Sequence, residues 1–155
     1  MSPVHHIPKG YSSITPYLVI RGAAEAIEYY KKVFGATEVM RLADPSGRIG
    51  HAELQIGGSH IMLADEHPEM GYRGPIPSGS SPVSILLYVE DVDSIVDRAV
   101  AAGAKILKPV QDQFYGDRSG FIQDPFGHFW GIATHIEDVS PEEMKERMKK
   151  LTQAA

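Results

Sequence analysis

TPYLVIRGAAEAIEYYKKVFGATEV, residues 15–39, and SILLYVEDVDSIVDRAVAAGAKIL, residues 84–107, repeat one pattern. Each stretch has a short apolar run, then apolar residues at helical spacing, then Gly-Ala and further apolar residues. The segments that follow, GRIGHAELQIGGSHIMLAD (47–65) and DRSGFIQDPFGHFWGIAT (117–134), also correspond to each other. The repeat predicts two βαβββ modules that each have an apolar face to bury, rather than a solenoid.

The composition is that of an ordinary globular protein. The 155 residues are 43% hydrophobic and 23% charged. The net charge of −5 does not favour binding to nucleic acid or to an anionic membrane. The absence of cysteine excludes disulfides, thiolate metal ligands and a cysteine nucleophile. No stretch approaches the roughly 20 apolar residues of a membrane span, and the first residues lack the apolar core of a signal peptide. We therefore expect a cytoplasmic protein.

The first module, residues 14–65, begins with a strand at 14–20 and a helix at 23–34 that ends at Gly35. A second strand is expected at 37–42, before the turn Asp44-Pro-Ser-Gly47. HAELQI and SHIMLA then flank Gly57-Gly58, which suits a type I′ hairpin turn. In that register Glu53 faces Met62. The apolar set Ala52, Leu54, Ile56, Ile61 and Leu63 shares the face that meets the helix.

Residues 65–82 are rich in Pro, Gly and Ser, and they form the expected linker to the second module at 83–134. Asp91 is the expected N-cap of the second helix. A tail at 135–155 holds Ser140-Pro141-Glu142-Glu143, a capping box that predicts a helix to about Leu151. The predicted fold class is α+β, with one domain over 14–134 and a C-terminal helix.

Two βαβββ modules with EYYKKVFGA at 28–36 and DPFGH at 124–128 resemble the vicinal oxygen chelate superfamily. This superfamily includes glyoxalase I, bleomycin-resistance proteins, fosfomycin-resistance proteins and extradiol dioxygenases. The region 115–144 also looks like its PhnB-like, glyoxalase-like branch. The resemblance implies that the modules form open half-barrels around a concave cavity.

The resemblance also implies where a divalent metal would be bound in the metal-dependent members. The corresponding positions, on the first and last strands of each module, hold Thr15, Met62, Ser84 and Gly131. Hydroxyls, a thioether and a glycine are poor substitutes for imidazole and carboxylate ligands. We therefore expect that the usual metal site is absent and that no cofactor is needed.

Strand alternation assigns a mixed aromatic and polar set of side chains to the cavity face, as is common in small-ligand pockets. The set comprises Tyr17, Val19, His51, Glu53, Gln55, His60, Met62, Leu86, Tyr88, Arg118, Ile122 and Phe129. Trp130 alternates to the opposite side and is expected in the core.

Two functional hypotheses follow from this face. In the first, the protein binds a small molecule without a metal or turnover, using Tyr17, His60, Met62, Tyr88, Tyr115, Arg118 and Phe129. The bleomycin-resistance branch sequesters a drug in this way, usually in a groove between two subunits, which implies a homodimer.

In the second hypothesis, the protein is a lyase, isomerase or dioxygenase. Glu53 and His51 would act as an acid–base pair, or together with His60 would hold a relocated divalent metal. A polar strand face with no chemical role is the simpler alternative.

The loop 114–118 precedes a strand at the expected rim of the cavity. Arg118 suits a ligand carboxylate or phosphate, and the alternative is a surface pair with Asp117. His128 is expected to support the turn 124–127 rather than to take part in catalysis.

Overall fold

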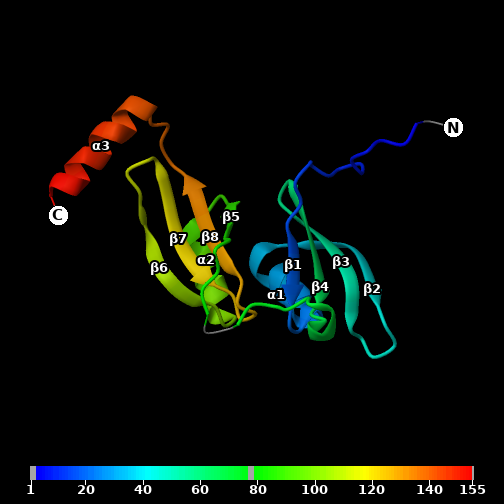
Figure 1. The fold of residues 1–155 in the computed structure, drawn as a ribbon. Helices are drawn as coiled ribbons and strands as arrows, with labels where there is room; N and C mark the ends of the chain where they lie inside the picture. The colour runs from blue at the N-terminus through cyan, green and yellow to red at the C-terminus, as the bar shows by residue number, and fades with distance from the viewer. Residues whose placement is uncertain (1–2, 77–78, 155) are drawn as a thin grey trace. The chain divides into compact units, whose positions relative to one another are not determined.

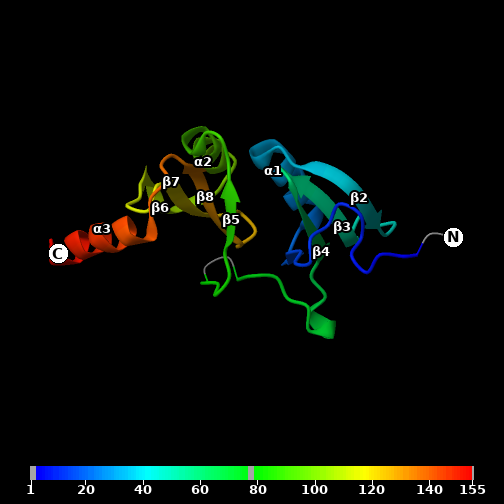
Figure 2. The ribbon, with the colours of Figure 1, turned by 90° about the horizontal axis from the view of Figure 1, so that it is seen from above.

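The computed structural model describes residues 3–76 and 79–154, which divide into two compact units with their boundary between Gly79 and Ser80. Each unit contains one four-stranded mixed sheet with a helix on one face (Figures 1 and 2). The predicted α+β fold with two βαβββ modules and a C-terminal helix is confirmed. The predicted linker includes Pro77 and Ser78, which lie outside the described residues.

The first unit has the strand order β1-β4-β3-β2. Its strands are β1 (Tyr17–Ile20), β2 (Thr37–Ala43), β3 (Ile49–Ile56) and β4 (Ser59–Asp65), and α1 (Ala23–Phe34) contacts all four. Helix α1 buries a stripe that includes Ile27, Tyr30 and Val33 against the sheet. Burial of each such side chain contributes about 1.5–3 kcal/mol. The helix ends at Gly35, whose φ of 68° is the left-handed C-terminal conformation that favours glycine.

The hairpin register was predicted correctly, but its turn type was not. Glu53 pairs with Met62 and Ile56 pairs with Ser59, and the five apolar residues assigned to the helix side are all buried. Of the two turn glycines, only Gly57 has a φ in the left-handed region. A type I′ turn needs positive φ at both central residues, so this turn instead has the pattern of type II′.

The second unit repeats the architecture with the order β5-β8-β7-β6. Its elements are β5 (Ile85–Tyr88), α2 (Val92–Ala101), β6 (Lys105–Asp112), β7 (Asp117–Gln123) and β8 (Phe129–His135). Asp91 caps α2 through its carboxylate, as predicted. The parallel pairs Tyr17–Met62 in the first unit and Leu86–Gly131 in the second occupy equivalent places. The sequence repeat is therefore a structural repeat.

Two helices lie outside the repeated pattern. A 3₁₀ helix, η1 (Pro68–Met70), occurs in the segment that was expected to be an irregular linker. The C-terminal helix α3 (Pro141–Gln153) begins at Ser140, whose hydroxyl accepts a hydrogen bond from the Glu143 amide. Helix α3 buries no residue, and Figure 1 shows it extending beyond the end of β8.

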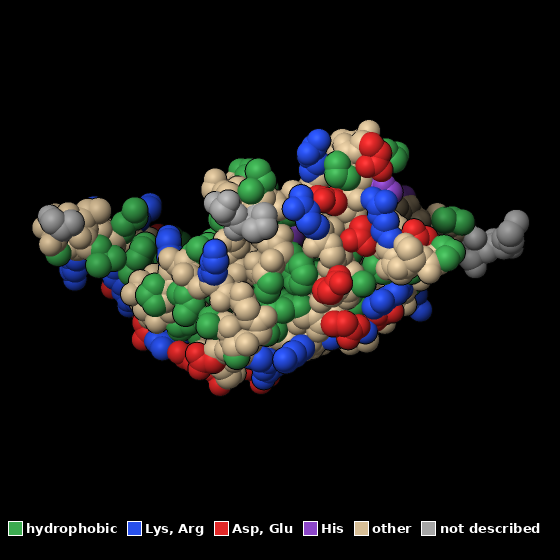
Figure 3. Space-filling view, turned by 90° about the horizontal axis from the view of Figure 1, so that it is seen from below, with side chains coloured by type: hydrophobic (Ala, Val, Ile, Leu, Met, Phe, Trp, Pro, Cys, Tyr) green, Lys and Arg blue, Asp and Glu red, His purple; other side chains and the backbone are tan. Residues whose placement is uncertain are grey.

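In the described part of the chain, no helix combines the length and apolar character needed to cross a bilayer. On the face drawn in Figure 3, acidic and basic side chains are interspersed, without one large patch of a single charge.

Candidate functional site

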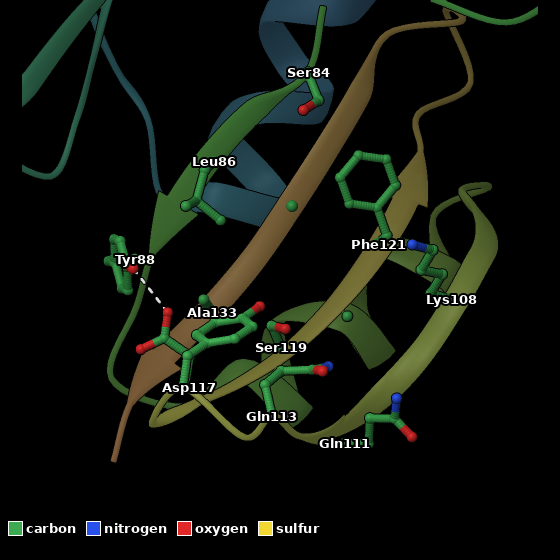
Figure 4. A pocket seen from close by; sticks show the side chains of 13 residues that line it. Ser84, Leu86, Tyr88, Lys108, Gln111, Gln113, Asp117, Ser119, Phe121 and Ala133 are labelled. Atoms are coloured by element: carbon green, nitrogen blue, oxygen red, sulfur yellow. Dashed lines mark hydrogen bonds between the residues drawn. The ribbon is translucent and has the colours of Figure 1, made fainter. Parts of the chain in front are cut away.

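A pocket of about 520 Å³ lies on the face of the second sheet opposite α2 (Figure 4). Its volume falls within the range of small-molecule sites. Its lining comes from all four strands and from the loop between β6 and β7. The lining residues are Ser84, Leu86, Tyr88, Lys108, Gln111, Gln113, Tyr115, Asp117, Ser119, Gly120, Phe121, Gly131 and Ala133.

Small residues form the floor of this pocket. Ser119 pairs with Ala133 across β7 and β8, and Gly131 lies between Leu86 and Phe121 on the neighbouring strands. A Cβ atom added to Gly131 would lie 3.0 Å from Leu86 Cδ1 and 3.4 Å from the Phe121 ring. These two apolar side chains therefore flank the space above the glycine, and a larger residue at this position would displace them.

A chain of hydrogen bonds begins at the pocket wall and ends in the C-terminal segment. The Tyr88 hydroxyl donates to Asp117 Oδ2 at 2.7 Å, and His135 Nδ1 lies 2.8 Å from Asp117 Oδ1. The other ring nitrogen of His135 lies 2.7 Å from Asp138 Oδ1. Both oxygens of the buried Asp117 carboxylate are thus engaged within the protein.

These contacts set the direction of two pKa shifts. The hydrogen bond to Asp117 raises the pKa of the Tyr88 hydroxyl above its ordinary value. Hydrogen bonds to Asp117 and Asp138 raise the pKa of His135, because two carboxylates favour the imidazolium form. When His135 is protonated, its positive charge compensates the negative charge of Asp117.

Polar groups with free hydrogen-bonding capacity lie along the opposite wall. Figure 4 shows Lys108, Gln111 and Gln113 directed toward the pocket from β6 and the loop after it. Among the residues that the structure describes, Lys108 has no carboxylate within ion-pair distance. The wall therefore presents one positive charge and two primary amides.

The loop that supplies Gln113 and Tyr115 is fixed by the C-terminal segment. The Gly116 carbonyl accepts hydrogen bonds from the amides of Ile136 and Glu137, and Arg147 of α3 donates to the Phe114 carbonyl at 3.1 Å. Gly116 has a φ of 100°, and a Cβ atom there would collide with the Glu137 carbonyl oxygen. Only glycine permits this close approach.

The two predicted catalytic residues lie together on the first sheet. His51 Nε2 lies 3.0 Å from Glu53 Oε2, and the Tyr17 hydroxyl lies 2.8 Å from His51 Nδ1. The other oxygen of Glu53 accepts a hydrogen bond from the Tyr11 hydroxyl. Since a carboxylate only accepts, His51 donates to Glu53 through Nε2, and in its neutral form it accepts from Tyr17 through Nδ1.

His60 and Met62 lie on β4 beside this cluster. The Tyr11 ring stacks on His60 with 4.2 Å between ring centroids, and Met62 lies between Tyr17 and Glu53 across the sheet. Tyr11 was not a predicted site residue, because it belongs to an N-terminal arm with no periodic pattern.

A second pocket, of about 620 Å³, lies on the first unit. It is lined by Tyr17, Val19, Gly50, Ala64, Asp65, His67, Met70 and Tyr72, and so it includes two of the side chains predicted for the cavity face, Tyr17 and Val19. Burial and the neighbouring Tyr72 raise the pKa of the Tyr17 hydroxyl, so this phenol stays protonated around neutral pH.

Arg118 and Ile122 do not lie on the pocket face, contrary to our prediction. Arg118 Nε lies 2.8 Å from Asp93 of α2, and Ile122 is fully buried in the core. The residues of β7 that line the pocket are instead Asp117, Ser119 and Phe121.

The cause of the error is the loop before β8. Five residues separate the paired Gln123 and Phe129, whereas two separate Ile56 and Ser59. The residues of β7 that face the pocket therefore cannot be assigned by analogy with the first hairpin.

Three other predictions about this region have mixed outcomes. Trp130 is buried in the core, as predicted, and its indole donates to Asp124. Phe129 contacts the Phe121 ring edge-on, but it does not line the pocket. The amide of His128 donates to Asp124 within the turn, as expected for a residue in a structural position.

The geometry can be compared with known proteins. The family model described as Glyoxalase/Bleomycin resistance protein/Dioxygenase superfamily matches residues 10–132. The chain therefore belongs to this superfamily, as its sequence resemblance indicated.

The chain is also similar to individual proteins. The protein Mb0911c of Mycobacterium bovis is 40% identical over 139 residues, which cover 88% of this chain and 91% of that protein. The crystal structure of TioX from Micromonospora sp. ML1 is 26% identical with a TM-score of 0.60, over 83% of this chain and 100% of TioX. The PhnB protein from Bacillus cereus is 20% identical with a TM-score of 0.64, over 79% of this chain and 99% of that chain, and shows likeness of fold alone.

Proposed function

We propose that this protein binds a small organic molecule in the pocket of the second module. The observation that carries this proposal is the pocket itself, in which a floor of small residues lies between aromatic and amide-bearing walls. Such a mixture of apolar area with a few polar groups is typical of small-ligand sites. Tyr88 and Tyr115, both predicted ligand-binding residues, belong to its lining.

We also propose that binding does not use the metal of the metal-dependent superfamily members. Among the four positions that the resemblance assigns to ligands, Met62 offers a soft thioether, and Gly131 is covered by Leu86 and Phe121. The donor set does not fit a divalent cation that prefers imidazole and carboxylate. No group of three His, Asp or Glu side chains suited to a metal occurs among the described residues.

A fragment titration tests the binding proposal. Amide chemical shifts in ¹H–¹⁵N spectra should move together at Leu86, Ser119 and Gly131 when a fragment of a mixed aromatic and polar library binds. Ser119→Leu fills the floor and should abolish these shifts, whereas Ser80→Leu, at an exposed position outside the pocket, should leave them unchanged. EDTA should have no effect. A library without any saturable fragment in this pocket would contradict the proposal.

The hydrogen-bonded cluster on the first sheet supports a second candidate function, acid–base catalysis by Glu53 and His51. The Tyr17–His51–Glu53 chain is suited to moving a proton along the strand face. However, both oxygens of Glu53 already accept hydrogen bonds, which favours a structural role. The second candidate is therefore ranked below ligand binding.

An activity screen distinguishes these two roles. Any lyase, isomerase or dioxygenase activity that depends on this cluster should disappear in Glu53→Gln. It should persist in Gln55→Ala, which changes an exposed neighbour on the same strand. An activity that survives Glu53→Gln with an unchanged rate would rule out this use of Glu53.

Three finer assignments remain proposals. We propose that the chain forms a homodimer, that it belongs to the PhnB-like branch and that it resides in the cytoplasm. The resemblance of residues 115–144 to that branch supports the second of these. Cell fractionation would test the third.

A further inference from the structure

We propose that the ligand of the second-module pocket is a small organic monoanion, a carboxylate on a planar apolar body. Its charge would pair with Lys108, and its body would lie against Leu86 and Phe121. This inference rests on the proposed function, because it names the chemical class that the same pocket would select.

The charges around the pocket favour an anion. Lys108 lines the pocket and has no carboxylate partner among the described residues, so its ammonium group is available to a ligand. Asp117 is the one acidic residue of the lining, and its two oxygens are engaged by Tyr88 and His135. Both oxygens of the Asp117 carboxylate are therefore engaged within the protein, whereas the Lys108 ammonium group has no carboxylate partner among the described residues.

The same arrangement favours a single negative charge. Phosphate groups are commonly held by the planar fork of arginine, which binds two oxygens at once. Arg118 is held by Asp93 and Asp112, and Arg147 is held by Glu137 and Glu143. Lysine acts as a compact point charge, so one ammonium group neutralises a carboxylate but leaves the second charge of a dianion without a partner.

The apolar part of the ligand is defined by the pocket floor. Leu86 and Phe121 lie on either side of Gly131, and Figure 4 shows the Lys108 side chain extending toward Phe121 from β6. A flat ring on these two side chains would place an attached carboxylate near the ammonium group. Gln111 and Gln113 lie further along the same wall and can donate to ring substituents.

Three probes with one ring system separate charge from shape. The probes are 1-naphthoate, the neutral 1-naphthamide and 1-naphthyl phosphate, each titrated into the full chain and followed by ¹H–¹⁵N spectra. We expect 1-naphthoate to shift the pocket amides and to bind about two- to fivefold more tightly than 1-naphthamide, as for one screened charge pair. The phosphate should bind no more tightly than the carboxylate.

Two charge-removing variants test the role of Lys108. Lys108→Gln should weaken the binding of 1-naphthoate by the same factor and leave the affinity for 1-naphthamide unchanged. Lys105→Gln removes the same charge from the same strand outside the pocket, and it should change neither affinity. Spectra of both variants report whether the fold is intact.

The possible failures are distinguishable. Equal affinity of 1-naphthoate and 1-naphthamide, or equal weakening by the two lysine variants, would overturn the monoanion inference while leaving the binding function in place. Markedly tighter binding of the phosphate would overturn the preference for a single charge. If no probe and no library fragment shifts the pocket amides, the proposed function itself fails.

Discussion

Asp124 joins one turn to the core of the second unit. Its Oδ1 accepts from the amides of Phe126 and His128, and its Oδ2 accepts from the Trp130 indole, all at 2.9 Å. Asp44 forms a similar turn in the first unit with the amides of Ser46 and Arg48, but it is exposed and holds no core side chain. The two turns therefore form a matched pair that differs in burial.

Asp124→Ala should reduce the free energy of unfolding by about 2–4 kcal/mol, because the variant leaves the buried indole N–H without its acceptor. Urea denaturation measures this loss. The control Asp44→Ala should cost clearly less, since water can replace an exposed carboxylate. Equal losses in the two variants would mean that the turn, and not the buried indole contact, supplies the stability.

His135 gives the second unit a pH-dependent contribution to stability. Its pKa in the folded state is raised by Asp117 and Asp138, with Tyr88 donating to the far oxygen of Asp117. Because the pKa of His135 is higher in the folded state, its contribution to stability is fully present below the pKa of the unfolded state, about 6.5. It is then lost as pH rises through the folded-state pKa.

The difference in stability between the wild type and His135→Gln should therefore be larger at pH 6 than at pH 8.5. Denaturation curves at several pH values, with an NMR titration of the imidazole, provide the measurement. A difference that stays constant over this range would show that protonation of His135 does not stabilise the fold.

At the scale of elements, each sheet caps the helix of its own module. Asp65 at the end of β4 accepts from the amides of Gly22 and Ala23 at the start of α1. Thr134 on β8 accepts from the amide of Val92, the first residue of α2. These side chains satisfy amides that lack a partner within the helix, and so they fix where each helix begins.

Helix α3 depends on polar contacts, since it buries no residue. Arg147 joins it to the Phe114 carbonyl and to Glu137, and thus to the loop that supplies Tyr115 to the pocket. Arg147→Met should accelerate amide hydrogen exchange in α3 and at Ile136 and Glu137, with β7 and β8 still protected.

Lys149→Met is the matched control for this exchange experiment. Its ion pair with Glu146 stays within the helix, so exchange around the loop should not change. If Arg147→Met also leaves exchange in α3 unchanged, Arg147 is not what fixes the helix.

At the scale of the whole molecule, the two units present open sheet faces with large apolar side chains exposed. Tyr17 of the first unit and Leu86 and Tyr88 of the second are about half exposed. Aromatic side chains at exposed positions often mark surfaces that bind ligands or partners. They are the features that support the proposed homodimer.

Sedimentation equilibrium should give about twice the chain mass of 17.0 kDa if the homodimer forms at micromolar concentration. The double variant Leu86→Ser/Tyr88→Ser should lower the association if these side chains contribute to it. A single species at the chain mass across the accessible concentrations would contradict the homodimer.

The local patterns of the sequence determined most of the fold. The correct predictions all describe interactions between near neighbours in the chain. They are the repeat, the helical spacing before Gly35 and Gly103, the capping residues Asp91 and Ser140, and the Gly57-Gly58 hairpin. Such interactions can be predicted from the periodicity and the turn-forming residues of a short stretch of sequence. For the same reason, His51 and Glu53 could be placed on one face of one strand before the structure was known.

Only the tertiary structure decided which residues form the pocket. The five-residue loop at Asp124 sets the pairing of β7 with β8, and this pairing puts Asp117, Ser119 and Phe121 on the pocket face in place of Arg118 and Ile122. The contacts of His135 with Asp117, and of Tyr11 with Glu53 and His60, join residues far apart in the chain. Local periodicity carries no information about such pairs, because they depend on strand pairing and on where an irregular arm packs.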